Sequence, residues 1–330
     1  MIDITNPQID FAVQSVRKAC LLVRKIQREL VVPALTKSDK SPVTVADFAS
    51  QALVAYYLQQ SFPNEGLVAE EDASELRPGE SSKLLEQITG YIREFISQAT
   101  PETVCEWIDR GTRPHGNRFW TLDPVDGTKG FLRRDQYAVA LALVDGGKVE
   151  IGVLGCPNLA KARRIDLKGQ GSLTIAVRGQ GTWTCPIDNL SPLERLQVSD
   201  RSELVNSRLL RSFESGHTNS DNTEKFLQVI GSQVEPVLMD SQAKYSLLAS
   251  GEGEILLRLL SIDQPEYREM IWDQAAGSII LEEAGGKITD LAGRTLDFSS
   301  GRTLSKNRGI LASNGKLHSA ALEALRSIGI

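Results

Sequence analysis

Cysteine and histidine are scarce in this sequence, and their spacing excludes two common ways of stabilising a fold. Only four cysteines and three histidines occur among the 330 residues. The cysteines stand apart, with no Cys-x-x-Cys pair, at Cys20, Cys105, Cys156 and Cys185. This spacing excludes a zinc site built from cysteine and histidine, and it provides no disulfide framework. We therefore expect free thiols and a reducing, cytoplasmic location.

A surplus of positive charge and a long apolar run are also missing. The chain has 37 basic and 42 acidic residues and a net charge of −5, so a general affinity for nucleic acid is not expected. No apolar run reaches the length that crosses a bilayer, and the opening residues MIDITNPQID lack the basic and apolar regions of a targeting segment. We expect a monomer whose partner is a small molecule, not a nucleic acid or a membrane.

The length of the chain favours two lobes, because 330 residues exceed what one minimal core needs. Residues 186–196 have a loop-like composition, with Asn189, Ser191 and Pro192. We therefore predict an N-terminal lobe over 1–190 and a C-terminal lobe over 191–330.

Hydrophobic periodicity predicts a mixture of helices and strands in both lobes. In the first lobe, apolar residues three or four apart predict helices over 9–30 and 84–96, and another helix after Thr44, which can cap it. Short apolar runs predict a strand at 67–69 and hairpins over 137–154 and 172–185. In the second lobe, short strands and helices alternate through 208–213, 223–230, 254–260, 274–284, 309–312 and 317–328.

The stretch FWTLDPVDGTKGF, residues 119–131, is the most informative part of the sequence. Its β-prone apolar run is predicted to end at Asp123, and a second carboxylate, Asp126, follows three positions later. Pro124 fixes its own φ between them, so both carboxylates and the Val125 carbonyl can face one point. Oxygen ligands from one tight turn are what Mg²⁺ prefers. The five residues D-P-x-D-G alone would equally suit a surface turn.

The residues that follow this turn can hold an anion. Gly127 frees the backbone for a sharp bend. The amides of Gly127 and Thr128 and the Thr128 hydroxyl come next, where they can hold a phosphate oxygen.

Three further acidic stretches allow both a structural and a functional interpretation. Asp47 falls in the first turn of a predicted helix, where an acid favours the helix dipole. Glu70 and Glu71 follow a strand, and runs of acids are usually solvated. Asp273 precedes a predicted helix, where it suits an N-cap. Each can also line a cation site.

Together these stretches closely resemble the lithium-sensitive, magnesium-dependent phosphatase superfamily of the inositol monophosphatase type. The matching segments are K-S-D-K-S-P-V-T-V-A-D (37–47), A-E-E (69–71), L-D-P-V-D-G-T (122–128) and W-D-Q-A-A-G (272–277). The resemblance implies a layered αβαβα sandwich of two lobes, with the site between them. It implies two or three Mg²⁺ held by Glu70, Asp123, the Val125 carbonyl, Asp126 and Asp273, with Glu71 in support. It assigns Asp47 and Thr128 to a water that attacks the phosphate, and it implies inhibition by Li⁺.

Four residues bear on the substrate, although each has an ordinary explanation as a solvated or snorkelling side chain. They are His217 in E-S-G-H, Ser241 and Lys244 in D-S-Q-A-K-Y, and Arg258 in L-R-L. In this order they resemble the pocket of the 3′(2′),5′-bisphosphate nucleotidase branch, in which Asp273 also belongs to the substrate site. A bisphosphate needs a second anchor for the phosphate that is not hydrolysed, and cationic donors supply it.

These features lead to a hypothesis of magnesium-dependent hydrolysis of the 3′-phosphate of adenosine 3′,5′-bisphosphate. The 2′,5′ isomer and the 3′-phosphorylated sulfate donor PAPS are further candidates. The usual covalent nucleophiles of phosphatases are missing, because no cysteine has an arginine six positions later and the motif aspartates are not spaced D-x-D. The alternatives are the same chemistry on an inositol phosphate, or a non-catalytic sensor of adenosine bisphosphate.

Overall fold

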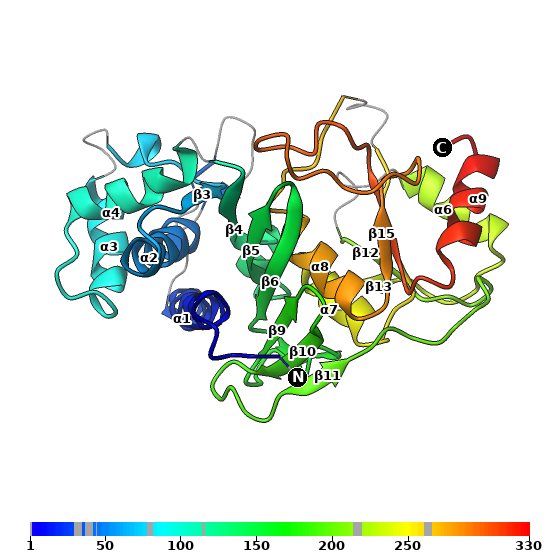
Figure 1. Cartoon of the computed structure of the whole chain (residues 1–330), viewed down its shortest axis with the longest axis horizontal. Helices are drawn as coiled ribbons and strands as arrows, with labels where there is room; N and C mark the ends of the chain where they lie inside the picture. The colour runs from blue at the N-terminus through cyan, green and yellow to red at the C-terminus, as the bar shows by residue number, and fades with distance from the viewer. Residues whose placement is uncertain are drawn as a thin grey trace.

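The computed structural model describes residues 2–29, 35–36, 42–43, 45–77, 82–113, 116–213, 220–260 and 266–330. Within these residues the chain forms five layers that alternate between helices and sheets (Figure 1). The expected αβαβα sandwich is therefore confirmed. No helix in the described ranges combines the length and the apolar character that crossing a membrane requires.

Four helices form the first layer, and a seven-stranded sheet forms the second. The helices are α1 (Pro7–Glu29), α2 (Val45–Ser61), α3 (Ser82–Arg93) and α4 (Pro101–Ile108). The strands are β3 (Gly66–Ala69), β4 (Arg118–Asp126), β5 (Ala138–Asp145), β6 (Lys148–Cys156), β9 (Ser172–Val177), β10 (Gly181–Pro186) and β11 (Glu194–Leu196). Their order is β11-β10-β9-β6-β5-β4-β3, and only the β3–β4 pair is parallel.

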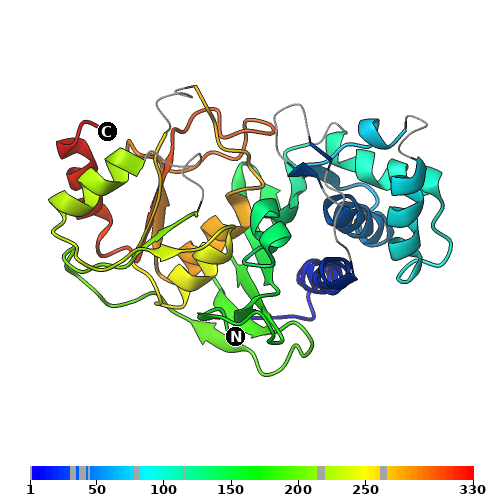
Figure 2. The ribbon, with the colours of Figure 1, turned by 180° about the vertical axis from the view of Figure 1, so that it is seen from behind.

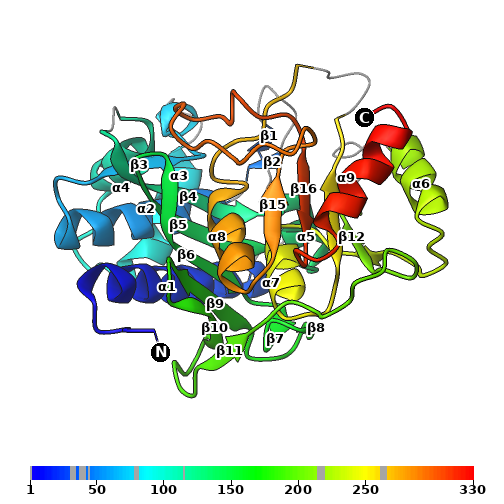
Figure 3. The same ribbon diagram turned by 45° about the vertical axis from the view of Figure 1, so that its right-hand side comes forward.

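The remaining layers come from the second half of the chain. Helices α7 (Ala243–Ala249) and α8 (Ala275–Glu283) lie between the two sheets, as the view from behind shows (Figure 2). The second sheet contains β12 (Leu209–Arg211), β13 (Val237–Leu238), β14 (Ile255–Arg258), β15 (Lys287–Thr289) and β16 (Ile310–Ser313). Helices α6 (Ser220–Val229) and α9 (His318–Ser327) lie side by side on its outer face (Figure 3).

Short elements complete the described chain. They are α5 (Thr128–Arg133), the strand pairs β1 (Leu35–Thr36) with β2 (Pro42–Val43) and β7 (Leu159–Ala160) with β8 (Arg164–Ile165), and the 3₁₀ turns Ser74–Leu76 and Asp109–Thr112. Most long predicted helices and hairpins lie where the sequence placed them. The sequence analysis missed several short elements, among them α4, α7, β11 and β15, because each is too short to show a clear period.

Three apolar clusters hold the layers together. The first joins α1 to α4 with one face of the seven-stranded sheet. The second fills the space between the sheets, where α8 packs on β6 and β9. The third lies under α6 and α9. The first sheet includes β11, so the chain leaves this sheet only after Leu196. Helix α8, from the second half of the chain, then packs on the same sheet. The division at residue 190 stays a prediction.

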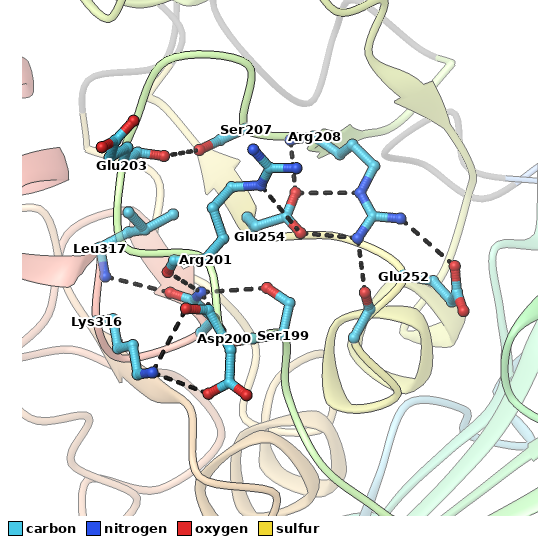
Figure 4. A network of polar contacts seen from close by, with 12 residues as sticks. Ser199, Asp200, Arg201, Glu203, Ser207, Arg208, Glu252, Glu254, Lys316 and Leu317 are labelled. Carbon is cyan, nitrogen blue, oxygen red and sulfur yellow. Dashed lines mark hydrogen bonds and ion pairs between the residues drawn. The ribbon is translucent and has the colours of Figure 1, made fainter.

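A polar network ties the segment after β11 to the second sheet (Figure 4). Glu254 is fully buried, and its carboxylate accepts hydrogen bonds from the Arg208 backbone at 2.7 Å and from the Arg208 guanidinium at 2.7 and 3.1 Å. Arg201 approaches the same carboxylate at 3.8 Å. Burial acts to raise the pKa of Glu254, but the Arg208 hydrogen bonds outweigh it and hold the pKa below its usual range.

We expect Glu254→Gln to lower the free energy of unfolding by about 2 kcal/mol at pH 7. Removing one partner of a buried pair costs about 3–5 kcal/mol, and the partial exposure of Arg208 reduces this. Because the pKa of Glu254 is lowered on folding, its contribution is lost as the pH falls through that folded-state value, so the difference should shrink in acid. Urea unfolding at pH 7 and pH 4 measures both effects.

The matched control is Lys316→Ala, which removes an exposed ion pair with Asp200 at 2.8 Å in the same network. Exposed pairs contribute about 0–1 kcal/mol, so this variant should remain near the wild type. Equal losses in the two variants would contradict the role assigned to Glu254.

Candidate active site

The two motif aspartates lie at a bulge near the end of β4. The sequence analysis ended the strand at Asp123, but this was wrong, since β4 continues to Asp126. Asp123 pairs with Ala140 and Asp126 with Ala138, so β4 carries one extra residue between them. Proline has no N–H for a ladder, and a bulge tolerates it. The bulge redirects the carboxylates from an otherwise regular strand.

The turn after β4 requires glycine at position 127. Gly127 has φ +83°, and a Cβ there would lie 3.0 Å from the Cβ of Ser241. Ser241 itself has a positive φ of 68°, which is strained for a residue with a side chain. The Thr128 hydroxyl donates to the Val125 carbonyl at 3.2 Å. Two tight turns from distant parts of the chain therefore pack against each other.

Glu70 is placed beside Asp123 by the parallel pairing of β3 with β4. Ala69 is opposite Leu122, so the next residue on each strand carries an acid at the same edge of the sheet. Glu71 is buried, and the side chain of Gln51 holds its backbone by hydrogen bonds of 2.9 and 2.7 Å. The acidic run is therefore not a fully solvated loop.

Asp47 and Asp273 are placed by two helices that lie on opposite sides of the seven-stranded sheet, α2 and α8. Asp47 is buried in the first turn of α2. The neighbouring Ser50 hydroxyl donates to the Pro124 carbonyl at 2.9 Å, which ties this helix to the β4 bulge. Asp273 directly precedes α8, but the N-cap residue is Gln274, so the N-cap interpretation of Asp273 was wrong. A carboxylate outside the helix is free to face the sheet edge.

Electrostatics indicate that these acids share one neighbourhood. Burial raises the pKa of Asp123 well above its usual range, and the carboxylates of Asp126, Glu70, Asp273 and Asp47 raise it further. Burial likewise raises the pKa of Asp273, which Arg258 lowers and Asp126 raises. Carboxylates from four separate stretches of the chain therefore lie close enough to interact electrostatically.

The donor set fits a divalent cation. The Oδ1 atom of Asp123 is buried and accepts no hydrogen bond from any residue that the structure describes. Crowded, buried carboxylates with raised pKa values are stabilised by a cation, and hard cations prefer oxygen ligands. As the side chains stand, no three acidic, histidine or cysteine groups within the described ranges form a ready metal site. The assignment of individual ligands therefore stays a prediction.

Basic groups face this acidic cluster from the C-terminal half. Burial raises the pKa of Asp126, whereas Lys244, a hydrogen bond from Gln242 and Arg258 act to lower it. Lys244 is buried and donates to the Ser212 hydroxyl at 3.2 Å and the Met239 carbonyl at 3.0 Å. Burial lowers the pKa of Lys244 to about 8. Because this pKa is close to neutral pH, an anionic partner would stabilise the charged form of the buried amine.

Arg258 is held in place by an acidic residue that the sequence analysis did not single out. Its guanidinium contacts the carboxylate of Glu269 at 2.9 and 3.0 Å, and Gln274 donates to the same carboxylate at 2.9 Å. Ser241 lies at the turn that contacts Gly127. His217 lies outside the described residues. The nucleotide-binding roles of all four residues stay predictions.

Sequence reasoning also missed residues that position the site through the backbone. Gln51 lies one helical turn after Asp47, so helical spacing could have identified it. Arg302 donates to the carbonyls of Ala69 at 2.7 Å and Gly111 at 3.0 Å, and its guanidinium lies 4.6 Å from the Trp272 ring. No local pattern marks Arg302, because its partners are distant in sequence.

Comparison with known proteins extends these observations to the whole chain. The model described as "Inositol monophosphatase family" matches residues 5–329. A 3′(2′),5′-bisphosphate nucleotidase from Oryza sativa is 41% identical over 334 residues, covering 96% of this chain and 92% of the relative. A protein of the same name from Schizosaccharomyces pombe is 38% identical, covering 96% of this chain and 94% of the relative.

Solved structures agree with the fold. The IMPase from Thermotoga maritima superposes with a TM-score of 0.67 and covers 97% of both chains. Its sequence identity is 21%, so this likeness supports the architecture and not a substrate.

Proposed function

Because this chain belongs to the inositol monophosphatase family, whose members use divalent metal ions, we propose that it is a 3′(2′),5′-bisphosphate nucleotidase. The reaction is hydrolysis of the 3′-phosphate of adenosine 3′,5′-bisphosphate to AMP and phosphate. The 2′,5′ isomer and PAPS are proposed as further substrates. The protein is accordingly a phosphoric monoester hydrolase.

The observation that carries the choice of substrate is the position of Lys244 and Arg258. Both act on the pKa of Asp126, so the basic groups lie close to the carboxylates and not on a remote surface. A bisphosphate presents two anionic groups, one for the metal ions at the carboxylates and one for these basic groups. A monophosphate would leave Lys244 and Arg258 without a phosphate to bind.

The residues divide into three roles under this proposal. Glu70, Asp123, the Val125 carbonyl, Asp126 and Asp273 would hold two or three Mg²⁺, with Glu71 supporting Glu70. When bound, Mg²⁺ supplies positive charge that neutralises the phosphate oxygens and makes a water more acidic. Asp47 and Thr128 would orient the attacking water and draw off its proton, with the Asp47 carboxylate as the final acceptor.

Substrate contacts complete these roles. The Gly127 and Thr128 amides hold the phosphate that is removed. The cationic anchor for the other phosphate consists of Lys244 and Arg258. Ser241 and His217 are proposed as further substrate contacts. Asp273 is proposed to contact both the metal ions and the substrate. We further propose that the enzyme is located in the cytoplasm, since its four cysteines are free, buried thiols. We also propose that it acts as a monomer.

We expect the purified protein to release phosphate from adenosine 3′,5′-bisphosphate when Mg²⁺ is present. This release should stop when EDTA is in excess. Excess Mg²⁺ should restore the rate, because bound cations neutralise the phosphate oxygens, which the negatively charged carboxylates cannot do. Phosphate release and AMP formation are measured together. Li⁺ should inhibit the restored reaction, as the family resemblance implies. Release that persists after chelation would refute the metal-dependent proposal.

A side-by-side rate comparison tests the two alternatives. Faster turnover of an inositol phosphate than of adenosine 3′,5′-bisphosphate would favour an inositol phosphate phosphatase. Binding of the nucleotide without any turnover in Mg²⁺ would favour the non-catalytic sensor.

A further inference from the structure

Two buried glutamines hold the backbone next to the acidic cluster. Gln51 is 0% exposed and Gln242 is 3% exposed. Burial of an amide is costly unless its donors and acceptor are used. Both side chains use the oxygen and the nitrogen of the amide in hydrogen bonds, and in each case a partner is a residue adjacent to a predicted metal ligand.

Gln51 joins the helix of Asp47 to the segment of Glu70. Its Nε2 donates to the carbonyls of Glu71 at 2.7 Å and Ile108 at 2.8 Å, and its Oε1 accepts from the Glu71 amide at 2.9 Å. The peptide groups on both sides of Glu71 are therefore fixed to α2. Because Asp47 lies on the same helix one turn earlier, this clamp sets the distance between two acids from different elements.

Gln242 joins the acids of β4 to the acid before α8. Its backbone N–H donates to the Asp126 carboxylate at 2.5 Å. Its Nε2 donates to the Trp272 carbonyl at 2.9 Å, and its Oε1 accepts from the Gly277 amide at 3.0 Å. Since Trp272 directly precedes Asp273, one residue fixes both a carboxylate of the first sheet and the backbone of the last predicted ligand.

We propose that Gln51 and Gln242 are positioning residues that set the spacing of the carboxylates for divalent metal ions. Like charges brought together in a buried site repel each other, so their spacing must be imposed by the surrounding structure. A buried glutamine whose Oε1 and Nε2 atoms are both hydrogen-bonded resists movement of the backbone segments that carry the carboxylates. The inference rests on the proposed function only in its choice of metal, because the hydrogen bonds are independent of the substrate.

The test measures Mg²⁺ affinity without turnover. We expect Gln51→Met and Gln242→Met each to raise the dissociation constant for Mg²⁺ about tenfold, the lower end of the range for residues that support metal ligands. Isothermal titration of the substrate-free protein with Mg²⁺ gives this constant. At saturating Mg²⁺, the KM for the nucleotide should stay within about twofold of the wild type, because neither side chain is assigned a contact with the substrate.

A matched control separates positioning from general destabilisation. Asn314 is also buried, and its Nδ2 donates to the carbonyls of Ser199 at 3.0 Å and Arg201 at 2.8 Å, neither of which adjoins a predicted ligand. Asn314→Leu should lower the melting temperature in EDTA but leave the Mg²⁺ constant unchanged. If the Gln51 and Gln242 variants also lose only melting temperature, the proposal is wrong.

Two further measurements keep the result decisive. Gln51→Asn and Gln242→Asn keep a neutral amide but shorten the side chain by one methylene, so that it no longer reaches its partners; they serve if the Met variants do not fold, and the same weakening is expected. Wild-type protein that binds Mg²⁺ but does not hydrolyse the bisphosphate would refute the nucleotidase proposal and leave this inference intact. Wild-type protein that binds no Mg²⁺ would overturn the inference.

Discussion

Replacing Asp123 by asparagine is expected to reduce phosphate release by at least about 10³-fold without destabilising the metal-free protein. Metal ions contribute several kcal/mol of charge stabilisation to such reactions, and each 1.36 kcal/mol corresponds to a factor of about ten. The carboxylate is buried, and its Oδ1 accepts no hydrogen bond from the described residues, so a neutral amide of the same shape removes a ligand and little packing. The measurements are kcat/KM with Mg²⁺ and the melting temperature in EDTA.

The pH dependence of stability provides a second readout for the same variant. Burial raises the pKa of Asp123 in the folded state, so the native protein binds more protons than the unfolded chain above the ordinary carboxyl value. The contribution of Asp123 to metal-free stability should therefore be most favourable in acid and be lost as the pH rises through the raised pKa. Asp123→Asn should reduce this loss, and Mg²⁺ should oppose it in the wild type.

The control for Asp123 is Asp145→Asn at the exposed end of β5. Asp145 forms a surface ion pair with Arg118, which contributes at most about 1 kcal/mol. Its rate should match the wild type. An Asp123→Asn enzyme with normal activity would refute the assignment of this carboxylate as a metal ligand.

Replacing Lys244 by methionine is expected to raise the KM for adenosine 3′,5′-bisphosphate about 10- to 100-fold. A hydrogen bond to a charged group contributes about 1.5–3 kcal/mol, and losing it weakens binding by that factor. The aliphatic part of the side chain is buried, so methionine keeps the packing. Initial rates with the bisphosphate, and with adenosine 3′-monophosphate, which lacks the second phosphate, measure the effect.

The selectivity of this change is its main test. Adenosine 3′-monophosphate and inositol phosphates have no second nucleotide phosphate for Lys244, so their kinetic constants should change little. Lys161→Met, which removes an exposed lysine paired with Glu194 at 3.5 Å, is the control and should change neither substrate. Equal losses on mono- and bisphosphate would place Lys244 at the reacting phosphate instead of at the second anchor.

Local sequence patterns predicted the elements that are long or strongly periodic. The apolar spacing of α1 is set by the face that it buries, whereas β5 and β6 are buried on both faces along most of their length and therefore show as continuous apolar runs. The end of β4 was misjudged because D-P-V-D is made of turn residues, whereas the pairing with β5 keeps it in the sheet as a bulge. Hydrogen bonding to a neighbouring strand overrode local preference.

The sequence by itself determined the chemical character of this protein: carboxylates at a glycine turn, no Cys-x-x-Cys pair or histidine cluster, and motifs that identify the family. These are properties of short segments, and a short segment keeps its composition in any fold. Only the tertiary structure decided that the acids act on one another, that Lys244 and Arg258 face them, and that Gln51 and Gln242 clamp their neighbours. Such relations depend on contacts between a side chain and residues that are distant in the sequence. The pairing of β3 with β4 and the packing of α8 on the first sheet determine these contacts.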